Sequence, residues 1–484
     1  MLTLGRYSSC RPSHRGKLGT IPSHWRAESL GRLGHLSKGK GGSKQDAAPW
    51  GVRCVRYGDI YTRYQGFIWK VTSYIEPSAT SRYTPIRRGD VLFAASGESI
   101  NEIGRSAVNL SSEPVVCGGD IIVFRPTAKM DPVFLGYACN AHPIAHQKSS
   151  MGRGFTVVHV YADELKQLVL PVPPLGEQVT IGAVLTEIDQ RINRLVASKR
   201  RLIGRLEEQK QAIIHRAVTR GLDAHVRLKP SGIDWLGEVP AHWEVGPLRR
   251  RYGVMDCKHV TVPFVDDGIP LASVREVKGF ELCLNNAKMT TEPWYRHLVA
   301  GERCPAVGDI IYCRNVGVGA AALVTTEERF AMGQDVCLIR TRREDGRFLN
   351  YFLRSLAMKH QLSQLLIGST FNRINVSDIK VLRLLYPPAE EQRAIARHLD
   401  EAVSGLDRSR ESAEREIALL REYRTRLITD VVTGKLDVRG VSLPPLPDEP
   451  DAPPDPDDAE PLDDPELMDA AEAMAERAAG DALT

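Results

Sequence analysis

The 484-residue sequence contains no uninterrupted apolar run of the roughly 20 residues that a membrane-spanning helix needs. Its first residues, MLTLGRYSSCRPSHRGK, also lack the apolar stretch of a secretory signal. The nine cysteines are scattered, without a C-x-x-C pair or the ligand spacing of a zinc site. We therefore expect a cytoplasmic protein with no membrane partner, no disulfide bond and no bound metal.

Motifs of catalysis are also missing. The sequence has no G-x-x-x-x-G-K-[ST] phosphate loop, which excludes ATP-driven movement by this chain. It has no N-P-P-Y-like or D-P-P-Y-like methyltransferase tetrapeptide, and no H-E-x-x-H or G-x-S-x-G. The phrase VGVGA at 316–320 lacks a third glycine and a βαβ context, so it predicts a hairpin rather than a nucleotide site. His24 and His242 stand beside tryptophans where each domain begins, which favours packing over catalysis. We expect a non-catalytic chain with no cofactor of its own.

Charge of both signs is present but unevenly placed. Residues 444–484 hold 14 acidic residues and one arginine, a net charge of −13, in a Pro- and Asp-rich stretch. Residues 1–443 carry 63 basic and 46 acidic groups, a net charge of +17. The stretch is expected to be a disordered, solvated tail. The basic remainder favours a polyanionic partner, although excess charge often serves only solubility.

The sequence repeats itself once. LPVPPLGEQVTIGAVLTEIDQRI at 170–192 resembles LLYPPAEEQRAIARHLDEAVSGL at 384–406, which places Gln178 and Gln392 214 positions apart. The phrase GKLGTIPSHW likewise matches DWLGEVPAHW, and IRRGDVLFA matches AVGDIIYCR. Each half is therefore predicted to be one copy of a single architecture.

Each copy begins with short β-rich runs separated by Gly, Asn and Pro turns, among them GDVLFA, DIIVF, GDIIYC and DVCLIR. The segments FLGYACNAH and RFLNYFLRSLAMKHQLSQLL have apolar residues at three- and four-residue steps and are expected to be helical. The fold class is therefore predicted to be α/β (α+β), with an irregular sheet in each copy.

After each Pro-Pro pair the pattern changes to that of one long helix. Steps of four and three residues continue over 181–213, and the same steps recur 214 positions later over 395–427. A period of 3.5 over more than four heptads is typical of a coiled coil. We expect the two helices to pair antiparallel along this seam, which includes Leu195 and Leu202. The alternative is that each helix packs only on its own domain.

Several phrases together resemble the specificity subunit of type I restriction-modification systems. They are PPLGEQ, PPAEEQRAIARHLDEAV, the helix ends AVTRGL and VVTGKL, SGIDWLGEVPAHWEV at 231–245, and GSTFNRINVSDIK at 368–380. The resemblance covers about residues 18–436. The first copy departs from the pattern where MGRGFTVVHV stands in place of GSTFNR and where Gly176 replaces an acidic residue, and the acidic tail lies outside it.

The resemblance implies two target-recognition domains joined by two conserved helices, with each domain recognising one half of a bipartite double-stranded DNA target. It implies two modification (methyltransferase) subunits that use S-adenosylmethionine, and restriction (translocase/nuclease) subunits that need ATP and magnesium. The expected parts are an N-terminal extension, expected to be disordered (1–17), target-recognition domain 1 (18–174), spacer helix 1 (175–222), target-recognition domain 2 (223–386), spacer helix 2 (387–438) and the tail (439–484).

DNA contacts need basic groups for phosphates and polar side chains for base edges. In the first domain the run SKGKGGSK places three lysines together, for which a flexible solvated loop is the alternative. The candidate contacts of this domain are Lys38, Lys40, Lys44, Arg63, Tyr64 and Arg82.

In the second domain Arg314 and Asn315 precede a small turn. Asn372 and Arg373 lie in the GSTFNR segment, where members of the family approach DNA. The sequence therefore predicts a non-catalytic, sequence-specific DNA-binding subunit. A rival class, an interaction scaffold that binds protein partners through its helices, would bind them without DNA and without sensitivity to salt. A self-sufficient methyltransferase or nuclease is opposed by the missing motifs.

Overall fold

The computed structural model describes residues 5–13, 18–154, 157–315, 317–341, 344–366 and 373–441. Residues 5–13 of the predicted N-terminal extension are described, whereas most of the predicted tail lies outside these ranges. The chain forms two compact units, Met1–Arg201 with Glu414–Thr484 (unit 1) and Leu202–Ala413 (unit 2). In the described part, no helix combines the length and apolar character that crossing a bilayer requires.

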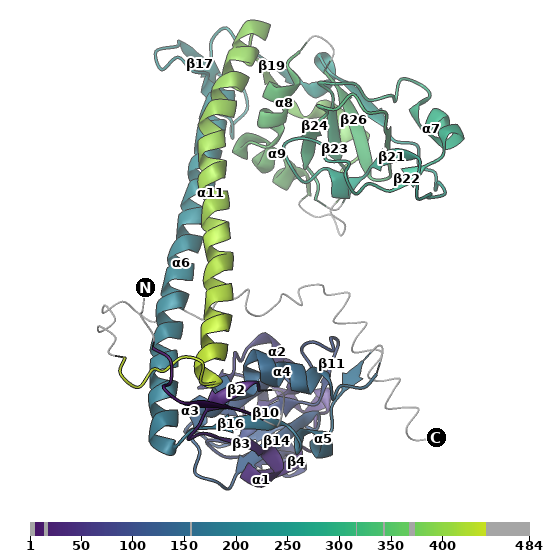
Figure 1. The fold of residues 1–484 in the computed structure, drawn as a ribbon. Helices are drawn as coiled ribbons and strands as arrows, with labels where there is room; N and C mark the ends of the chain where they lie inside the picture. Colours follow the sequence, from purple (N-terminus) through teal and green to yellow (C-terminus); the bar gives the residue numbers. More distant parts are fainter. Residues whose placement is uncertain are drawn as a thin grey trace. The chain divides into compact units, whose positions relative to one another are not determined.

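Unit 1 contains two five-stranded sheets and the helices that cover them (Figure 1). The buried strand of the GDVLFA phrase lies at the centre of the first sheet, between two antiparallel neighbours. The first sheet has the order β4 (Gly34–Lys38), β14 (Ile121–Pro126), β10 (Val91–Ala94), β12 (Ser106–Asn109) and β7 (Phe67–Ile68). The second has the order β5 (Ala47–Ala48), β8 (Tyr74–Ile75), β6 (Val52–Val55), β13 (Val115–Cys117) and β9 (Thr84–Ile86). The helices include α1 (Leu30–Leu33), α2 (Tyr57–Thr62), α3 (Pro132–Asn140), α4 (His142–Ser149) and α5 (Ala162–Leu165).

Unit 2 repeats this plan with a four-stranded and a three-stranded sheet. The four-stranded sheet has the order β20 (Gly253–Asp256), β26 (Val336–Arg340), β23 (Ile310–Cys313) and β24 (Ala321–Leu323). The other has the order β22 (Met289–Thr290), β21 (Ile269–Ala272) and β25 (Ala331–Met332). The helices include α7 (Glu292–Val299), α8 (Gly346–Leu353), α9 (Leu356–Leu366) and α10 (Val376–Val381). The predicted α/β class, the β-rich runs and the helical segments are confirmed.

Short ladders open each copy and match one another. In unit 1, β1 (Cys10–Pro12) pairs with β2 (Thr20–Pro22), and β3 (Arg26–Ser29) pairs with β16 (Val169–Val172). In unit 2, β17 (Leu228–Pro230) pairs with β18 (Glu238–Pro240), and β19 (Glu244–Pro247) pairs with β27 (Arg383–Tyr386). The predicted internal repeat is therefore a repeat of topology as well as of sequence.

The repeated glutamine holds the start of each long helix to its own unit. Gln178 accepts a hydrogen bond from the Asp131 amide at 2.9 Å and donates to Pro173 O at 2.8 Å. Gln392 does the same with the Asp345 amide at 3.1 Å and Pro387 O at 2.9 Å. Asp131 and Asp345 in turn cap helices α3 and α8 with their carboxylates. The phrase recurs because each copy needs this connection between a capped helix and a Pro-Pro turn.

The histidine of each P-x-H-W phrase also has a structural partner. His24 Nε2 lies 2.8 Å from Glu177 Oε2, and His242 Nε2 lies 2.8 Å from Glu391 Oε2. The neighbouring tryptophans are fully buried. Both glutamates belong to the first turn of a long helix. These contacts support the packing role that the sequence favours for the two histidines.

The long helices are α6 (Leu175–Arg220) and α11 (Ala389–Val432), and each contributes to both units. Ion pairs join the two helices: Asp189–Arg424 at 2.8 Å and Lys199–Glu416 at 2.7 Å in unit 1, and Lys210–Asp407 at 2.7 Å in unit 2. As the residue number rises along α6, the number of its partner on α11 falls, so the helices run in opposite directions. The predicted antiparallel pairing is confirmed within each unit.

The buried stripe on these helices differs from the predicted heptad seam. Leu195 is 51% exposed and Leu202 is 43% exposed. The isoleucines of α6 recur at 11-residue spacing (Ile181, Ile192, Ile203, Ile214), as do apolar residues of α11 (Ile395, Leu406, Ile417, Ile428), and all are buried or half-buried. An 11-residue repeat has 3.67 residues per turn, close to a straight helix, so the left-handed supercoil implied by heptads is not required.

Candidate DNA-contacting surfaces

Arg314 lies inside unit 2 instead of on its surface. It directly follows β23, is 4% exposed, and forms an ion pair with Asp256 at the end of β20. Its backbone nitrogen donates to Asp335 O at 2.9 Å, and its Nε donates to Ile374 O at 3.4 Å. Ile374 N donates back to Arg314 O at 2.9 Å. Arg314 therefore holds the segment that precedes α10 against the end of β23, which leaves it inaccessible to DNA in this conformation.

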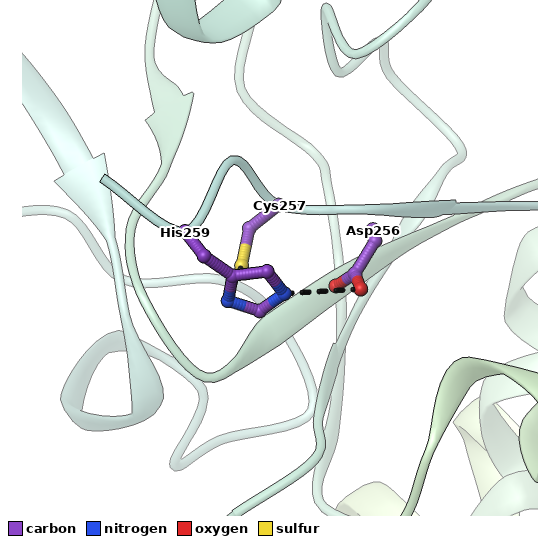
Figure 2. A group of neighbouring side chains, drawn as sticks. All are labelled: Asp256, Cys257 and His259. Atoms are coloured by element: carbon purple, nitrogen blue, oxygen red, sulfur yellow. Dashed lines mark hydrogen bonds and ion pairs between the residues drawn. The ribbon is translucent and has the colours of Figure 1, made fainter.

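Asp256 also belongs to a small cluster with Cys257 and His259 (Figure 2). His259 Nε2 lies 3.2 Å from Asp256 Oδ2, and His259 Nδ1 lies 3.9 Å from Cys257 Sγ. Nitrogen, sulfur and oxygen donors of this kind bind zinc in other proteins. Here, however, Asp256 is neutralised by Arg314, and burial raises the pKa of the Cys257 thiol, which keeps it protonated at neutral pH. Asp256 is better explained as the ion-pair partner of Arg314 than as a metal ligand.

Two of the predicted contacts of unit 2 flank this network. Asn315 is half-buried and Arg373 is exposed. The backbone bond from Ile374 N to Arg314 O, together with the side-chain bond from Arg314 Nε to Ile374 O, holds Asn315 and Arg373 at the same end of β23. Their role in DNA contact stays a prediction, and Asn372 lies outside the described residues.

The three candidate lysines of unit 1 belong to a closely packed run. Lys38 is exposed at the end of β4, Lys40 is exposed and donates its amide to Thr84 Oγ1 at 3.0 Å, and Lys44 begins a 3-10 turn, η1 (Lys44–Asp46). A Cβ on Gly39 would lie 2.1 Å from Gly118 O, so glycine is needed there for close backbone approach. The run is thus packed against the GGD turn, and its two exposed lysines stay candidates for phosphate contact.

The remaining candidates of unit 1 have partners within the protein. Arg63 donates to Thr72 Oγ1 at 3.0 Å and forms an ion pair with Asp59 at 3.5 Å. Arg82 is exposed and forms an ion pair with Asp46. Tyr64 is 7% exposed within a hydrophobic cluster, and burial raises its pKa to about 12. The two arginines can still face a phosphate, whereas the Tyr64 ring belongs to the core.

One exposed polar group of unit 1 was missed by the sequence reasoning. Strand β11 (Ser96–Gly97) pairs with β15 (Val158–His159), and Ser96 Oγ lies 3.0 Å from His159 Nδ1. Arg153 is bridged to His159 by two backbone hydrogen bonds of 2.9 and 2.8 Å. The signal was available, because aligning MGRGFTVVHV with the GSTFNR segment at an offset of 214 places His159 opposite Arg373.

Comparison with known proteins gives consistent results. The family model for the type I restriction modification DNA specificity domain matches residues 22–203 and 300–414. The chain is 23% identical over 389 residues to the type I restriction enzyme MjaVIII specificity subunit of Methanocaldococcus jannaschii, covering 77% of this chain and 86% of the relative. It is 20% identical over 361 residues to the type I restriction enzyme StySPI specificity subunit of Salmonella potsdam, covering 72% and 74%.

A solved structure is similar as well. A chain from work on the complex assembly and conformational transition of the type I R-M system aligns with a TM-score of 0.65 at 19% identity, covering 86% of this chain and 99% of the other. At this identity the likeness concerns the fold alone.

Proposed function

The chain belongs to the family defined by the type I restriction modification DNA specificity domain, and from this premise we propose that it recognises a bipartite DNA sequence, with one half-site bound by each unit. The observation that carries the proposal is the internal repeat. The glutamine and histidine contacts at the start of α6 recur at the start of α11. The polar side chains at equivalent strand ends differ, being the half-buried Ser96 and exposed His159 in one unit and the half-buried Asn315 and exposed Arg373 in the other. A constant frame with different contact residues suits the recognition of two different half-sites.

We propose that catalysis belongs to partner subunits that this chain directs to DNA. Two modification subunits would supply S-adenosylmethionine-dependent methylation, and restriction subunits would supply ATP- and magnesium-dependent translocation and cleavage. The sequence supports this division, because it has neither a phosphate loop nor a methyltransferase tetrapeptide.

Apolar side chains exposed on the long helices fit binding of such partners. Besides Leu195 and Leu202, Leu419 is 63% exposed and Tyr423 is 42% exposed. Large exposed apolar side chains on a helix favour a protein contact. They would also serve the rival scaffold function, in which the chain binds proteins and not DNA.

One experiment separates the two functions. Methylated adenines are mapped across the genome of cells that express the modification subunits with or without this chain. We expect a two-part methylated motif with an unspecified spacer only when the chain is present. Co-purification of the partners without any methylated motif, and without salt-sensitive DNA binding, would favour the scaffold.

A further inference from the structure

Two backbone hydrogen bonds identify equivalent positions in the two units. Val160 N donates to Ala95 O at 2.9 Å in unit 1, and Ile374 N donates to Arg314 O at 2.9 Å in unit 2. Ala95 follows β10 and Arg314 follows β23, the strands of the repeated GD phrase. Val160 and Ile374 are 214 positions apart, which is the offset of the repeat. Residues next to these bonds therefore occupy matching places.

The matching residues differ in chemistry but share exposure to solvent. The residue after Ala95 is Ser96 in unit 1, the residue after Arg314 is Asn315 in unit 2, and both are half-buried. The residue before the returning segment is His159 in unit 1 and Arg373 in unit 2, and both are exposed. Each unit thus presents two polar side chains at one end of its central strand.

We propose that Ser96 and His159 form the base-contacting position of unit 1, where they bind base edges of duplex DNA in one half of the target. The proposal rests on the proposed function and makes it specific for one unit. A hydroxyl and an imidazole each offer a donor and an acceptor, which is what contact with base edges requires.

The local geometry prepares this pair for contact. The hydrogen bond between Ser96 Oγ and Nδ1 orients the His159 ring, and no side chain of the described residues bonds to its Nε2. The Tyr61 hydroxyl donates to Ser96 O at 3.1 Å, and a Cβ on Gly97 would lie 2.6 Å from that hydroxyl oxygen. Tyr61 therefore holds the backbone of Ser96 and Gly97 closely, and His159 itself is exposed to solvent.

A cationic group stands beside the pair. The Arg153 side chain is 74% exposed and lies 2.6 Å from Glu164 Oε1. Its backbone is tied to His159 by the two bridging hydrogen bonds. Because an exposed ion pair contributes little to stability, the guanidinium can leave Glu164 for a phosphate oxygen. Phosphate and base contacts from adjacent residues are the usual arrangement at protein–DNA interfaces.

The test uses the full chain with its modification partners in cells, and the readout is the methylated-adenine motif. The variants are Ser96→Ala, His159→Ala and His159→Gln, with His146→Ala as the control because His146 is an exposed histidine of α4 in the same unit. We expect discrimination at one or more base pairs of a single half-site to fall by about tenfold or more, with the other half unchanged. His159→Gln should retain more discrimination than His159→Ala, because its amide keeps a donor and an acceptor. The control should leave the motif unchanged.

An unchanged motif in both Ser96→Ala and His159→Ala would overturn the proposal, as would equal relaxation of both half-sites. If His159→Ala abolishes methylation, the motifs of Ser96→Ala and His159→Gln are used instead: an unchanged motif in both, or equal relaxation of both half-sites, would overturn the proposal. Absence of any methylated motif with the wild-type chain would instead refute the proposed function itself, so the two failures are distinguishable.

Discussion

At the scale of single residues, burial separates side chains that hold the fold from those that can contact DNA. Arg314 is 4% exposed and forms an ion pair with Asp256, whereas Arg373 is exposed to solvent. The two arginines are linked through Ile374, which follows Arg373 in the chain and donates its backbone N–H to Arg314 O. Their substitution should therefore affect different properties.

Changing Arg314 to Met removes one member of a largely buried ion pair and leaves Asp256 without its partner. We expect a loss toward the lower end of about 3–5 kcal/mol in the free energy of unfolding, because the Asp256 side chain is 31% exposed. Arg373→Ala is the matched variant. It should change stability by no more than about 0.5 kcal/mol and weaken DNA binding by about 1–3 kcal/mol. Chemical unfolding and DNA titration measure the two effects, and equal destabilisation by both variants would contradict this assignment.

Lys148 gives a prediction about pH. It is 2% exposed, donates from Nζ to Gly104 O at 2.7 Å, and burial lowers its pKa to about 8. An unfolded lysine has a pKa of about 10.4, so between these values the unfolded chain binds a proton that the folded protein has released. Stability contributed by this group therefore rises as the pH rises through that window. We expect the wild type to gain about 3 kcal/mol relative to Lys148→Met between pH 8 and pH 10.5. The measurement is the free energy of unfolding of both proteins across this pH range, and an equal pH dependence in the two would contradict the prediction.

The sequence predicts the role of a residue only where neighbouring residues in the chain determine that role. The packing roles of His24 and His242 followed from their position beside a tryptophan where each domain begins. The burial of Tyr64 and the ion pair of Arg314 depend on residues far along the chain, such as Asp256, 58 positions from Arg314. No local periodicity carries that information. The Ser96–His159 contact joins positions 63 apart in the chain, and only the 214-position offset of the repeat indicated His159, as the residue opposite Arg373.

At the scale of elements, the long helices show which features of a pattern are robust. Their existence, length and antiparallel pairing followed from apolar periodicity and the Pro-Pro starts. The exact period did not, because 3.5 and 3.67 residues per turn differ by less than one position over two turns. Leu195 and Leu202 fit the heptad pattern, but burial follows the 11-residue spacing instead.

The period can be tested by insertion. Adding 11 residues after Gly204 and after Ser412 should keep the buried stripe in register, because 11 residues make three turns at 3.67 residues per turn. Adding nine residues at the same places should rotate the following stripe by about 160°. We expect cooperative thermal unfolding and partner co-purification to survive only the longer insertion. Survival of a seven-residue insertion with loss of the 11-residue one would restore the heptad seam.

The glutamines at the helix starts allow a matched pair of variants. Gln178→Ala and Gln392→Ala each leave a partly buried amide and a buried carbonyl without their side-chain partner. We expect each variant to lose about 1–3 kcal/mol of stability in its own unit. Hydrogen exchange should localise the effect to α3 for Gln178 and to α8 for Gln392. Faster hydrogen exchange in the unit that does not contain the substitution would contradict the prediction that each glutamine stabilises only its own unit.

At the scale of the whole molecule, the chain is one architecture used twice. The ladders, the GD turns, the glutamine contacts and the antiparallel helix pairs recur in both units, whereas the exposed residues at equivalent strand ends do not. The proposed function explains why such a frame is useful. A frame that stays constant while two contact surfaces vary can recognise two unrelated half-sites.

The most direct test of this account replaces residues 240–386 with the matching segment of a relative and maps the methylated-adenine motif of the resulting complex. The glutamine and histidine contacts at the start of each long helix lie within one unit. We therefore expect one half of the motif to change to that of the relative, while the other half stays as in the wild type. A motif in which both halves change, in a complex that still methylates DNA, would contradict independent recognition by the two units.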